Sequence, residues 1–355
     1  MEKKDDFVWG VLLHLGTNMW HDWNRDLVGI PSSLEEERKM YPDRKVGKHG
    51  ILPELVRNYL RADDAVWHEE TEAARREGLN LVIIDIGEGY AFPSRPELHV
   101  NGSWSPDKMR RELVRLRKMG LEPIPKLNFS TCHDQWLKEY HSRTSSRAYY
   151  EVVADVIRDV AEVFDRPRFF HLGFDEELPH GLRGRRQIVV RKGDLWWHDF
   201  FYAVGEVERH GARAVMWSDK ICDDRAEFLR RMSKGVLQMN WYYRSDFSPK
   251  KLAWNTAFEK KGGWGETVNG AAAFMELEKA GFDQMPCTSN WAEDASAEAV
   301  VKYCKEHIDP ARLKGFCTAP WAMTVPDTPE KTNISKVLFG IDLLSAARDR
   351  HYPKT

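Results

Sequence analysis

The sequence lacks the features that define several common classes of protein. It has only five cysteines in 355 residues, and no two of them have Cys-x-x-Cys spacing. A disulfide framework and a cysteine-ligated structural zinc site are therefore not expected. No apolar run is long enough to cross a membrane. The formal net charge of −2 gives no reason to expect nucleic acid or an anionic membrane surface as a partner.

Signatures of bound cofactors are also missing. No Gly-rich phosphate-binding turn follows any predicted strand, and neither His-x-His nor His-Glu-x-x-His spacing occurs in the chain. We therefore expect no cofactor and no metal. The first residues, MEKKDDFVWG, lack the apolar region of a signal peptide. A cytoplasmic chain and an exported chain without its leader both fit this start.

What the sequence does contain is a repeated alternation of strand-like and helix-like segments. The predicted strands are Phe7–Leu15, Leu79–Gly87, Glu122–Phe129, Arg168–Asp175, Ala212–Asp219, Gly235–Trp241, Asp283–Trp291 and Leu313–Trp321. The clearest amphipathic helices between and after them are Asp63–Glu77, Pro106–Met119, Arg147–Phe164, Trp196–His210 and Thr332–Ala347.

Eight such alternations predict an α/β protein, a single (β/α)8 TIM barrel, with a doubly wound open sheet as the alternative. No linker or low-complexity segment divides the chain, so residues 1–355 are expected to form one catalytic barrel without a separate N-terminal α/β domain. The longest insertion, about Asn18 to Arg61, follows the first strand. Its content of Pro, Gly and charge indicates an extended loop over the mouth of the barrel.

The most informative stretch is the fourth predicted strand, which ends in two adjacent acids, Asp175 and Glu176. The apolar residues before them indicate a buried strand, and burying charge without compensation is costly. Two carboxylates aimed at one point suit acid–base chemistry on a glycosidic bond. The simpler alternative is that the acids begin a solvated loop.

Polar and aromatic residues also stand at the carboxyl ends of the other predicted strands, where barrel enzymes place their active sites. Together with the two acids they predict a carbohydrate site. The expected substrate-binding residues are His14, Asn18, Asp85, Lys126, Asn128, His133, His171, Trp217, Asp219, Asn240, Tyr242, Trp291 and Trp321. The fourteen tryptophans agree with this interpretation, because sugar rings stack on flat aromatic faces.

Structural explanations for several of these residues stay open. His14 and His171 are equally compatible with core histidines bonded to the backbone, and Asp85 with Lys126 is equally compatible with an ion pair inside the barrel. Tryptophans also pack beneath loops. The loop after the acids carries a basic group, which is expected to be a solvated surface, with an anion-binding lid as the alternative. Its members are Arg183, Arg185, Arg186, Arg191 and Lys192.

The run His171-Leu-Gly-Phe-Asp-Glu176 resembles the His-x-Gly-Gly-Asp-Glu motif that ends strand four in family 20 glycoside hydrolases, the β-N-acetylhexosaminidases. The segment Trp217-Ser-Asp219 is similar to the tryptophan-bearing strand five of that family. The resemblance implies substrate-assisted retaining hydrolysis, in which the 2-acetamido carbonyl of the sugar attacks the anomeric carbon, so no protein nucleophile is needed.

By this resemblance, Glu176 would be the general acid and then the base, and Asp175 would orient the acetamido group. Trp217 would wall the acetamido pocket, and Tyr242 would donate a hydrogen bond to the acetamido oxygen. Phe174 replaces the second glycine of the motif and is expected to narrow the space beside the acids. His14 and Asn18 stand where the family has an arginine that grips sugar hydroxyls.

Three other functions are compatible with the same residues. One is a two-carboxylate glycosidase acting on a sugar without an acetamido group, with Asp85 or Asp175 as nucleophile or base. Another is a metal-dependent hydrolase or isomerase using His14, Asp85, His133, His171 and Glu176. The third is a barrel that binds glycans without catalysis. Tryptophan-rich loops at a barrel mouth also pack against neighbouring subunits, so a homo-oligomer is considered as well.

Overall fold

A computed structural model of the chain describes residues 7–20, 33, 35–36, 39, 56–178, 187–259, 265–329 and 331–353. Most of the loop expected between Asn18 and Arg61 lies outside the described residues. So do three members of the expected basic group, Arg183, Arg185 and Arg186. No helix among the described residues is long and apolar enough to span a membrane.

The strands form one parallel sheet in the order β6-β5-β4-β3-β2-β1-β8-β7. They are β1 Val8–His14, β2 Leu81–Asp85, β3 Glu122–Lys126, β4 Phe169–His171, β5 Arg213–Trp217, β6 Leu237–Met239, β7 Cys287–Thr288 and β8 Gly315–Thr318. The two ends of this order meet through single bridges between Gln238 and Gln284 and between Trp241 and Cys287. The sheet therefore closes, and the predicted (β/α)8 barrel is confirmed.

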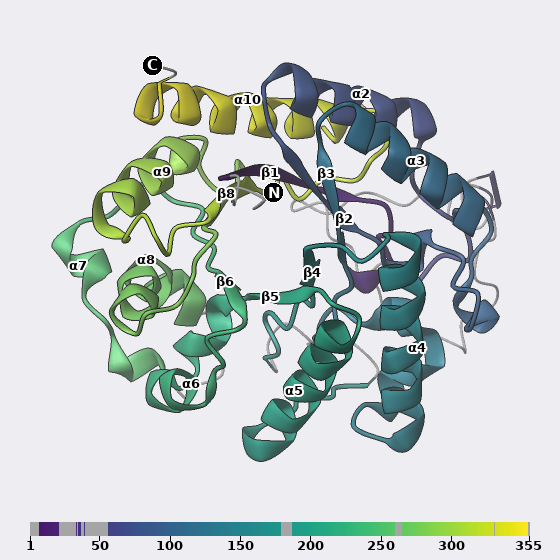
Figure 1. Cartoon of the computed structure of the whole chain (residues 1–355), viewed down its shortest axis with the longest axis horizontal. Coiled ribbons are helices and arrows are strands. Elements are labelled where there is room, and N and C mark those ends of the chain that lie inside the picture. Colours follow the sequence, from purple (N-terminus) through teal and green to yellow (C-terminus); the bar gives the residue numbers. More distant parts are fainter. Residues whose placement is uncertain are drawn as a thin grey trace.

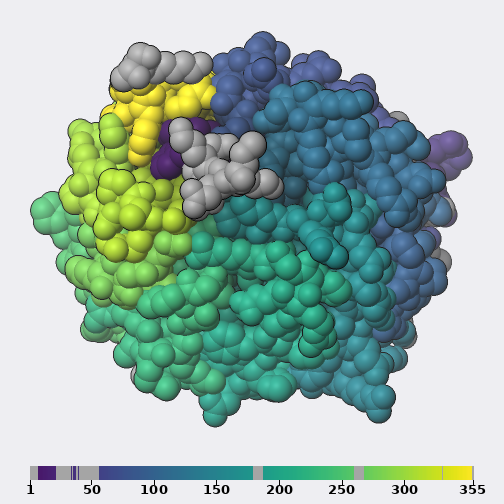
Figure 2. Space-filling view, viewed as in Figure 1, coloured from purple at the N-terminus to yellow at the C-terminus, as the bar shows by residue number. Residues whose placement is uncertain are grey.

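Helices form a ring around the strands (Figure 1). They are α2 Asp64–Arg76, α3 Pro106–Lys118, α4 Arg147–Val163, α5 Gly193–Arg209, α6 Arg225–Arg231, α7 Pro249–Leu252, α8 Gly265–Lys279, α9 Ser296–His307 and α10 Ile334–His351. Successive parts of the chain occupy successive sectors of the rim, so the colours in Figure 2 run around the molecule from blue to yellow. The first and last parts of the chain are consequently neighbours.

Helix α4 illustrates how the sequence specifies this outer ring. The hydroxyl of Ser146 accepts a hydrogen bond from the N–H of Tyr149 at 3.3 Å, which caps the first turn. Val153, Ile157 and Val160 follow at intervals of three and four, and all are buried. That spacing places them on one face of the helix, where burial against the barrel stabilises it by about 25 cal/mol per Å² of apolar surface.

The strands separate two cores, because successive side chains of a strand point to opposite faces. In β2, Leu81 and Ile83 join a cluster that contains no helix residue and fills the barrel interior. Val82 and Ile84 join the larger cluster that includes the helices. The next inward position of β2 is Asp85. The strand alternation thus places polar residues above an apolar floor at the carboxyl end of the barrel.

Candidate active site

Four polar residues stand side by side at the carboxyl ends of β1 to β4, one as the last residue of each strand. The strand register pairs His14 with Asp85, Asp85 with Lys126, and Lys126 with His171. All four are fully buried. Lys126 Nζ donates to Asp85 Oδ2 at 2.5 Å, and His14 Nδ1 lies 3.3 Å from the same oxygen. The ion pair considered for Asp85 and Lys126 is therefore present.

The electrostatics of this layer keep both imidazoles neutral. Burial lowers the pKa of His14, although Asp85 opposes that change. Burial, reinforced by the positive charge of Lys126, holds the pKa of His171 well below its usual range. The Gly173 N–H donates to His171 Nδ1 at 3.0 Å, so the proton of this ring is on Nε2. Burial disfavours the Asp85 anion, but Lys126 and His14 outweigh burial and lower its pKa.

The two acids follow β4 in a short turn and are not part of the strand itself. The prediction of a strand over Arg168–Asp175 is too long, since β4 ends at His171. Gly173, Phe174 and Glu176 have φ values of 72°, 65° and 53°. Left-handed backbone reverses the direction of the side chains, and it is costly for residues other than glycine. This turn separates Phe174, which enters the helical layer, from the acids.

Phe174 does not narrow the space beside the acids, so that expectation is wrong. Its ring packs against Phe129, Trp196 and Phe200 at centroid distances of 6.5, 5.6 and 5.1 Å. The guanidinium of Arg191 lies 5.0 Å from the same ring. Phe174 is thus an anchor of the turn in the outer core, and the packing offsets the strain of its left-handed backbone.

Hydrogen bonds hold both acids in place. Asn128 Nδ2 donates to Asp175 Oδ1 at 2.7 Å, while Asn128 Oδ1 accepts from the N–H groups of Ser130 and Phe174. The N–H of Glu176 donates to Asp219 Oδ2 at 2.8 Å. The side chain of Asp175 is 10% exposed and that of Glu176 is 37% exposed. Asp175 is therefore held in a buried position, whereas the side chain of Glu176 is partly open to solvent.

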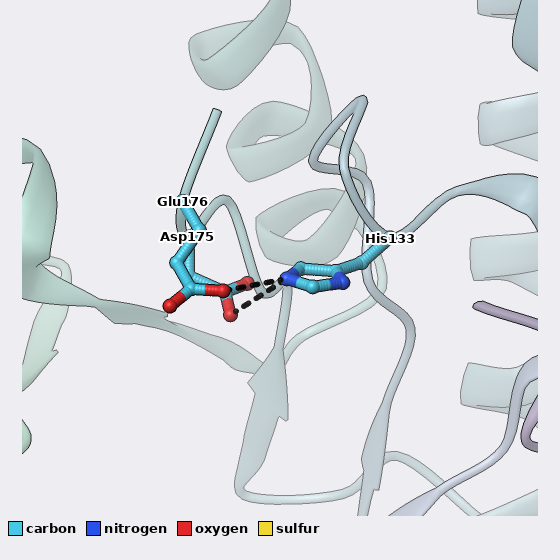
Figure 3. A group of neighbouring side chains, drawn as sticks. All are labelled: His133, Asp175 and Glu176. Carbon is cyan, nitrogen blue, oxygen red and sulfur yellow. Dashed lines mark ion pairs between the residues drawn. The ribbon is translucent and has the colours of Figure 1, made fainter. Parts of the chain in front are cut away.

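His133, from the loop after β3, faces both acids (Figure 3). Its Nε2 lies 3.4 Å from Asp175 Oδ2 and 3.4 Å from Glu176 Oε2. One nitrogen or oxygen atom from each of these three side chains lies within 4.8 Å of the other two. The fold therefore joins a residue predicted after strand three with the pair predicted after strand four.

A buried ionic network lies behind the turn. Arg191 was expected in a solvated basic loop, but it is buried, and it binds Glu177 through its N–H, Nε and Nη2 groups. Its Nη1 also lies 3.2 Å from Asp199 of α5. Both the ion pairs and the backbone contact tie the segment after the acids to the helical layer. The expectation for Arg191 is therefore wrong, because carboxylates not recognised from the sequence enclose it.

Aromatic rings surround the acids and the buried polar layer. Trp20 and Trp321 lie against His14, Trp217 lies against His171 at 4.6 Å, and Trp217 and Trp321 are 5.9 Å apart. Trp241 stacks on Tyr243 at 5.0 Å. Four of these five rings are tryptophans from the ends of different strands, as the sequence predicted for the mouth of the barrel.

Tyr243, and not Tyr242, faces the acids. The hydroxyl of Tyr242 donates to the backbone oxygen of Asp246 at 2.8 Å, and its ring packs on Phe247 in the outer core. Burial raises the pKa of Tyr243, and the charges of Glu176 and Asp175 raise it further. Its hydroxyl therefore keeps its proton. The period-two alternation from Leu237 and Met239, both inside the barrel, was the sequence signal that indicates Tyr243.

Three other predicted residues do not join this group through any contact among the described residues. The Asn18 amide exchanges hydrogen bonds with the backbone of Arg57. The Asn240 amide donates to the backbone oxygen of Gly270 in α8. Trp291 is 59% exposed. The side-chain amides of Asn18 and Asn240 thus stabilise the loops and helices around the site, because they form hydrogen bonds with backbone groups.

Comparisons with known proteins agree with the fold. No protein-family model and no curated protein matches the sequence. Among solved structures, the β-N-acetylhexosaminidase of Bacteroides fragilis matches with a TM-score of 0.58 and 11% identity, over 97% of this chain and 65% of that one. The family 20 β-N-acetylhexosaminidase of Streptomyces coelicolor matches with a TM-score of 0.54 and 13% identity, over 80% and 61%.

A third similar structure is the family 20 exo-β-N-acetylglucosaminidase of Vibrio harveyi in complex with N-acetylglucosamine, with a TM-score of 0.51 and 14% identity over 80% and 55%. The chain thus spans 55–65% of the length of these three proteins. It shares their fold. The resemblance first indicated by six residues of strand four extends, at low identity, to the barrel.

Proposed function

We propose that this protein is a retaining, substrate-assisted glycoside hydrolase acting on a terminal β-linked N-acetylhexosamine or a closely related sugar. The observation that carries the proposal is the arrangement of the two acids. Asp175 is buried and held by Asn128, while Glu176 is partly exposed beside it. Two adjacent carboxyl groups in different environments suit two different tasks in one reaction.

In the proposed reaction, Glu176 donates its proton to the glycosidic oxygen as the bond to the anomeric carbon breaks. The carbonyl oxygen of the 2-acetamido group forms the new bond to that carbon, giving an oxazolinium-type intermediate. Asp175 accepts a hydrogen bond from the acetamido N–H and stabilises its growing positive charge. Glu176 then removes a proton from water, and the water oxygen attacks the anomeric carbon. This attack opens the oxazolinium ring, and the product keeps the anomeric configuration of the substrate.

Tyr243 takes the role that the resemblance assigned to Tyr242. Because burial, with smaller contributions from the charges of the two acids, raises the pKa of Tyr243 well above its usual value, its hydroxyl keeps its proton at neutral pH and can donate it in a hydrogen bond. We propose that it donates to the acetamido oxygen and aligns that atom for attack. Trp217 and Trp321 would enclose the methyl group and the sugar face.

The buried polar layer supports a carbohydrate ligand. Several of its atoms have no hydrogen-bond partner among the described residues: His14 Nε2, Asp85 Oδ1, His171 Nε2 and Trp217 Nε1. Buried polar atoms without partners are costly and uncommon. They include both donors and acceptors, and they lie beneath aromatic rings. The hydroxyl groups of a sugar would satisfy both kinds once these rings move aside on binding.

Backbone strain is also present at this turn. Of the seven non-glycine residues with positive φ among the described residues, Phe174 and Glu176 stand on either side of Asp175. Such conformations cost about 1–3 kcal/mol each and persist where surrounding structure enforces them, often at active sites. Strain on both sides of Asp175 supports a held, functional turn over a solvated loop.

The decisive test is the variant Glu176→Gln. It removes the transferable proton while keeping the size of the side chain, so turnover of an aryl β-N-acetylglucosaminide should fall by about 10²–10⁴-fold. Binding of N-acetylglucosamine, measured by calorimetry, should persist. Glu69→Gln, at an exposed position of α2, is the control and should be unaffected. Equal turnover in Glu176→Gln and the wild type would reject the assignment.

The requirement for the acetamido group is tested with a second substrate. An aryl β-glucoside lacks the internal nucleophile and should be hydrolysed at least about 10²-fold more slowly, since the first bond-forming step is lost. A thiazoline analogue of the intermediate should inhibit competitively. Comparable rates on the two glycosides would instead favour the two-carboxylate mechanism. Sugar binding without turnover of either would favour a glycan-binding barrel.

A further inference from the structure

Among the described residues, His133, Asp175 and Glu176 form a group that could ligate a metal ion. Each offers one ligand atom: the Nε2 of the imidazole and one oxygen of each carboxylate (Figure 3). The imidazole nitrogen lies 3.4 Å from each of the two oxygens. That separation is longer than the roughly 2.7–3.2 Å between the nitrogen and oxygen atoms of a typical N–H···O hydrogen bond.

The separation matches the geometry of a bound zinc ion. Zinc lies about 2.0–2.1 Å from nitrogen and oxygen ligands in a tetrahedron. Two ligand atoms at that distance are about 3.3 Å apart along a tetrahedral edge. The two distances at His133 therefore already have the value that zinc requires. The two carboxylate oxygens lie no more than 4.8 Å apart, and rotation of the partly exposed Glu176 side chain can close the third edge.

The surroundings of the three ligands also suit a metal. Asn128 Nδ2 binds Asp175 Oδ1, which leaves Oδ2 directed toward His133 and fixes the carboxylate in a one-oxygen mode. Hydrogen bonds of this kind orient ligands in known metal sites. Two carboxylates balance the charge of a divalent cation. An imidazole in the ligand set favours zinc over magnesium or calcium, which prefer oxygen ligands alone.

We propose that His133, Asp175 and Glu176 form a zinc site that reversibly blocks this active site. Bound zinc would occupy the oxygen of Glu176 that carries the catalytic proton, and it would hold Asp175 away from the substrate. Water would complete the zinc coordination at the fourth position. The blocking effect rests on the proposed hydrolase function, whereas zinc binding does not.

Zinc binding is measured by titration calorimetry on untagged full-length protein that has been dialysed against a chelator. We expect zinc chloride to bind one site, and magnesium chloride at the same concentrations to give no binding. His133→Gln and Glu176→Gln should each weaken zinc binding by at least about tenfold, because loss of even an outer hydrogen-bond partner of a ligand costs roughly that much. Circular dichroism and melting curves verify that both variants fold.

The matched control is His68→Gln. His68 Nε2 also lies 3.4 Å from a carboxylate oxygen, that of Glu112 on α3, but it has one acid partner where His133 has two. This substitution should leave zinc binding unchanged. Zinc binding that is equally strong in His133→Gln and the wild type would overturn the proposed site.

The blocking effect is measured separately with the aryl glycoside. Zinc should inhibit turnover over the concentration range in which it binds, and a chelator should restore the full rate. Unchanged or increased turnover at saturating zinc would overturn the proposed inhibition. If no glycoside is hydrolysed, the function fails but calorimetry still tests the site. If a glycoside is hydrolysed and zinc does not bind, the site fails and the function stands.

Discussion

Burial makes a charged carboxylate costly, and two buried carboxyl groups of this protein differ in the partners that offset this cost. The partner decides whether each group is charged. Asp85 lies beside the cation of Lys126, so its pKa is lowered despite complete burial. Glu70 of α2 is also buried, but its Oε2 accepts only a hydrogen bond from the Thr324 hydroxyl at 3.0 Å. Burial therefore raises the pKa of Glu70 to about 8. A hydroxyl group does not replace a positive charge in a dry environment.

This difference predicts how stability depends on pH. Between its usual pKa of 4.5 and about 8, Glu70 keeps its proton when folded and loses it when unfolded. The free energy of unfolding should therefore fall as pH rises through this window, at roughly 1.4 kcal/mol per pH unit as an upper limit. Glu70→Gln removes this dependence, so the variant should be more stable than the wild type at pH 9.

Urea denaturation of both proteins at pH 5, 7 and 9 measures the effect. The stability difference between variant and wild type should grow with pH across the window. Glu72→Gln, at an exposed position of α2 whose charge does not contribute to the pKa of Glu70, should show no such growth. A stability difference for Glu70→Gln that is constant from pH 5 to pH 9 would contradict the prediction.

At the scale of elements, the turn after β4 carries most of the functional geometry. It lies between β3 and β5, because Asn128 holds Asp175 from one side and Asp219 holds the backbone of Glu176 from the other. Behind it, Arg191 binds Glu177 in the outer layer. These contacts on three sides of the turn fix the positions of the two acids, because supporting hydrogen bonds and packing lock side-chain geometry.

Gly173 is the residue on which this turn depends most. Its φ is +72°, and a Cβ atom there would lie 2.1 Å from Asn128 Oδ1 and 2.9 Å from Asn128 Cα. Gly173→Ala should therefore displace Asn128 and release Asp175. We expect turnover to fall by at least about 10²-fold, as small misplacements of reacting groups can cost, and stability to fall by about 2 kcal/mol.

The control variant Gly211→Ala introduces the same kind of backbone strain as Gly173→Ala but no steric clash. Gly211 has φ +81°, yet a Cβ there would meet nothing within 4 Å. It should lose only about 1 kcal/mol of stability and keep full activity. Activity measured at a temperature where both variants are folded tests the comparison. Full activity in Gly173→Ala would show that the turn tolerates movement of Asn128.

At the scale of the whole molecule, the two ends of the chain are locked together. Strand β1 pairs with β8 along four register positions from Val8 to Val11. On the rim, Arg348 and Ser345 of α10 donate to the backbone oxygen of Glu77 at the end of α2. Neither half of the barrel can therefore open without breaking sheet pairing at both edges.

We accordingly propose that the chain folds as one domain, and this has a calorimetric consequence. Heating should give one transition whose calorimetric and van't Hoff enthalpies agree, as expected for cooperative unfolding. The reason is that the interior cluster takes residues from every strand, so loss of one sector exposes the core of all. Two resolved transitions in differential scanning calorimetry would contradict a single domain.

Much of this architecture was already present in the sequence. Runs of β-branched and aromatic residues marked every strand, because this signal is local to the chain. The position of His14, Asp85, Lys126 and His171 near strand ends followed from the same pattern. The strand-four motif identified the two acids and the likeness to family 20 barrels. None of these inferences required knowledge of which segments meet in space.

Only the tertiary structure decided the rest. Left-handed backbone at Gly173 and Phe174 sent the phenyl ring outward, and no local pattern predicts a reversal enforced by packing against α5. Alternation along β6 gives the inward direction of Tyr243, but how near it lies to the acids depends on how the segments after β4 and β6 pack. His133 stands between Asp175 and Glu176 because two loops converge. Sequence periodicity determines which face a residue takes within an element, but distances between elements depend on packing, which is collective.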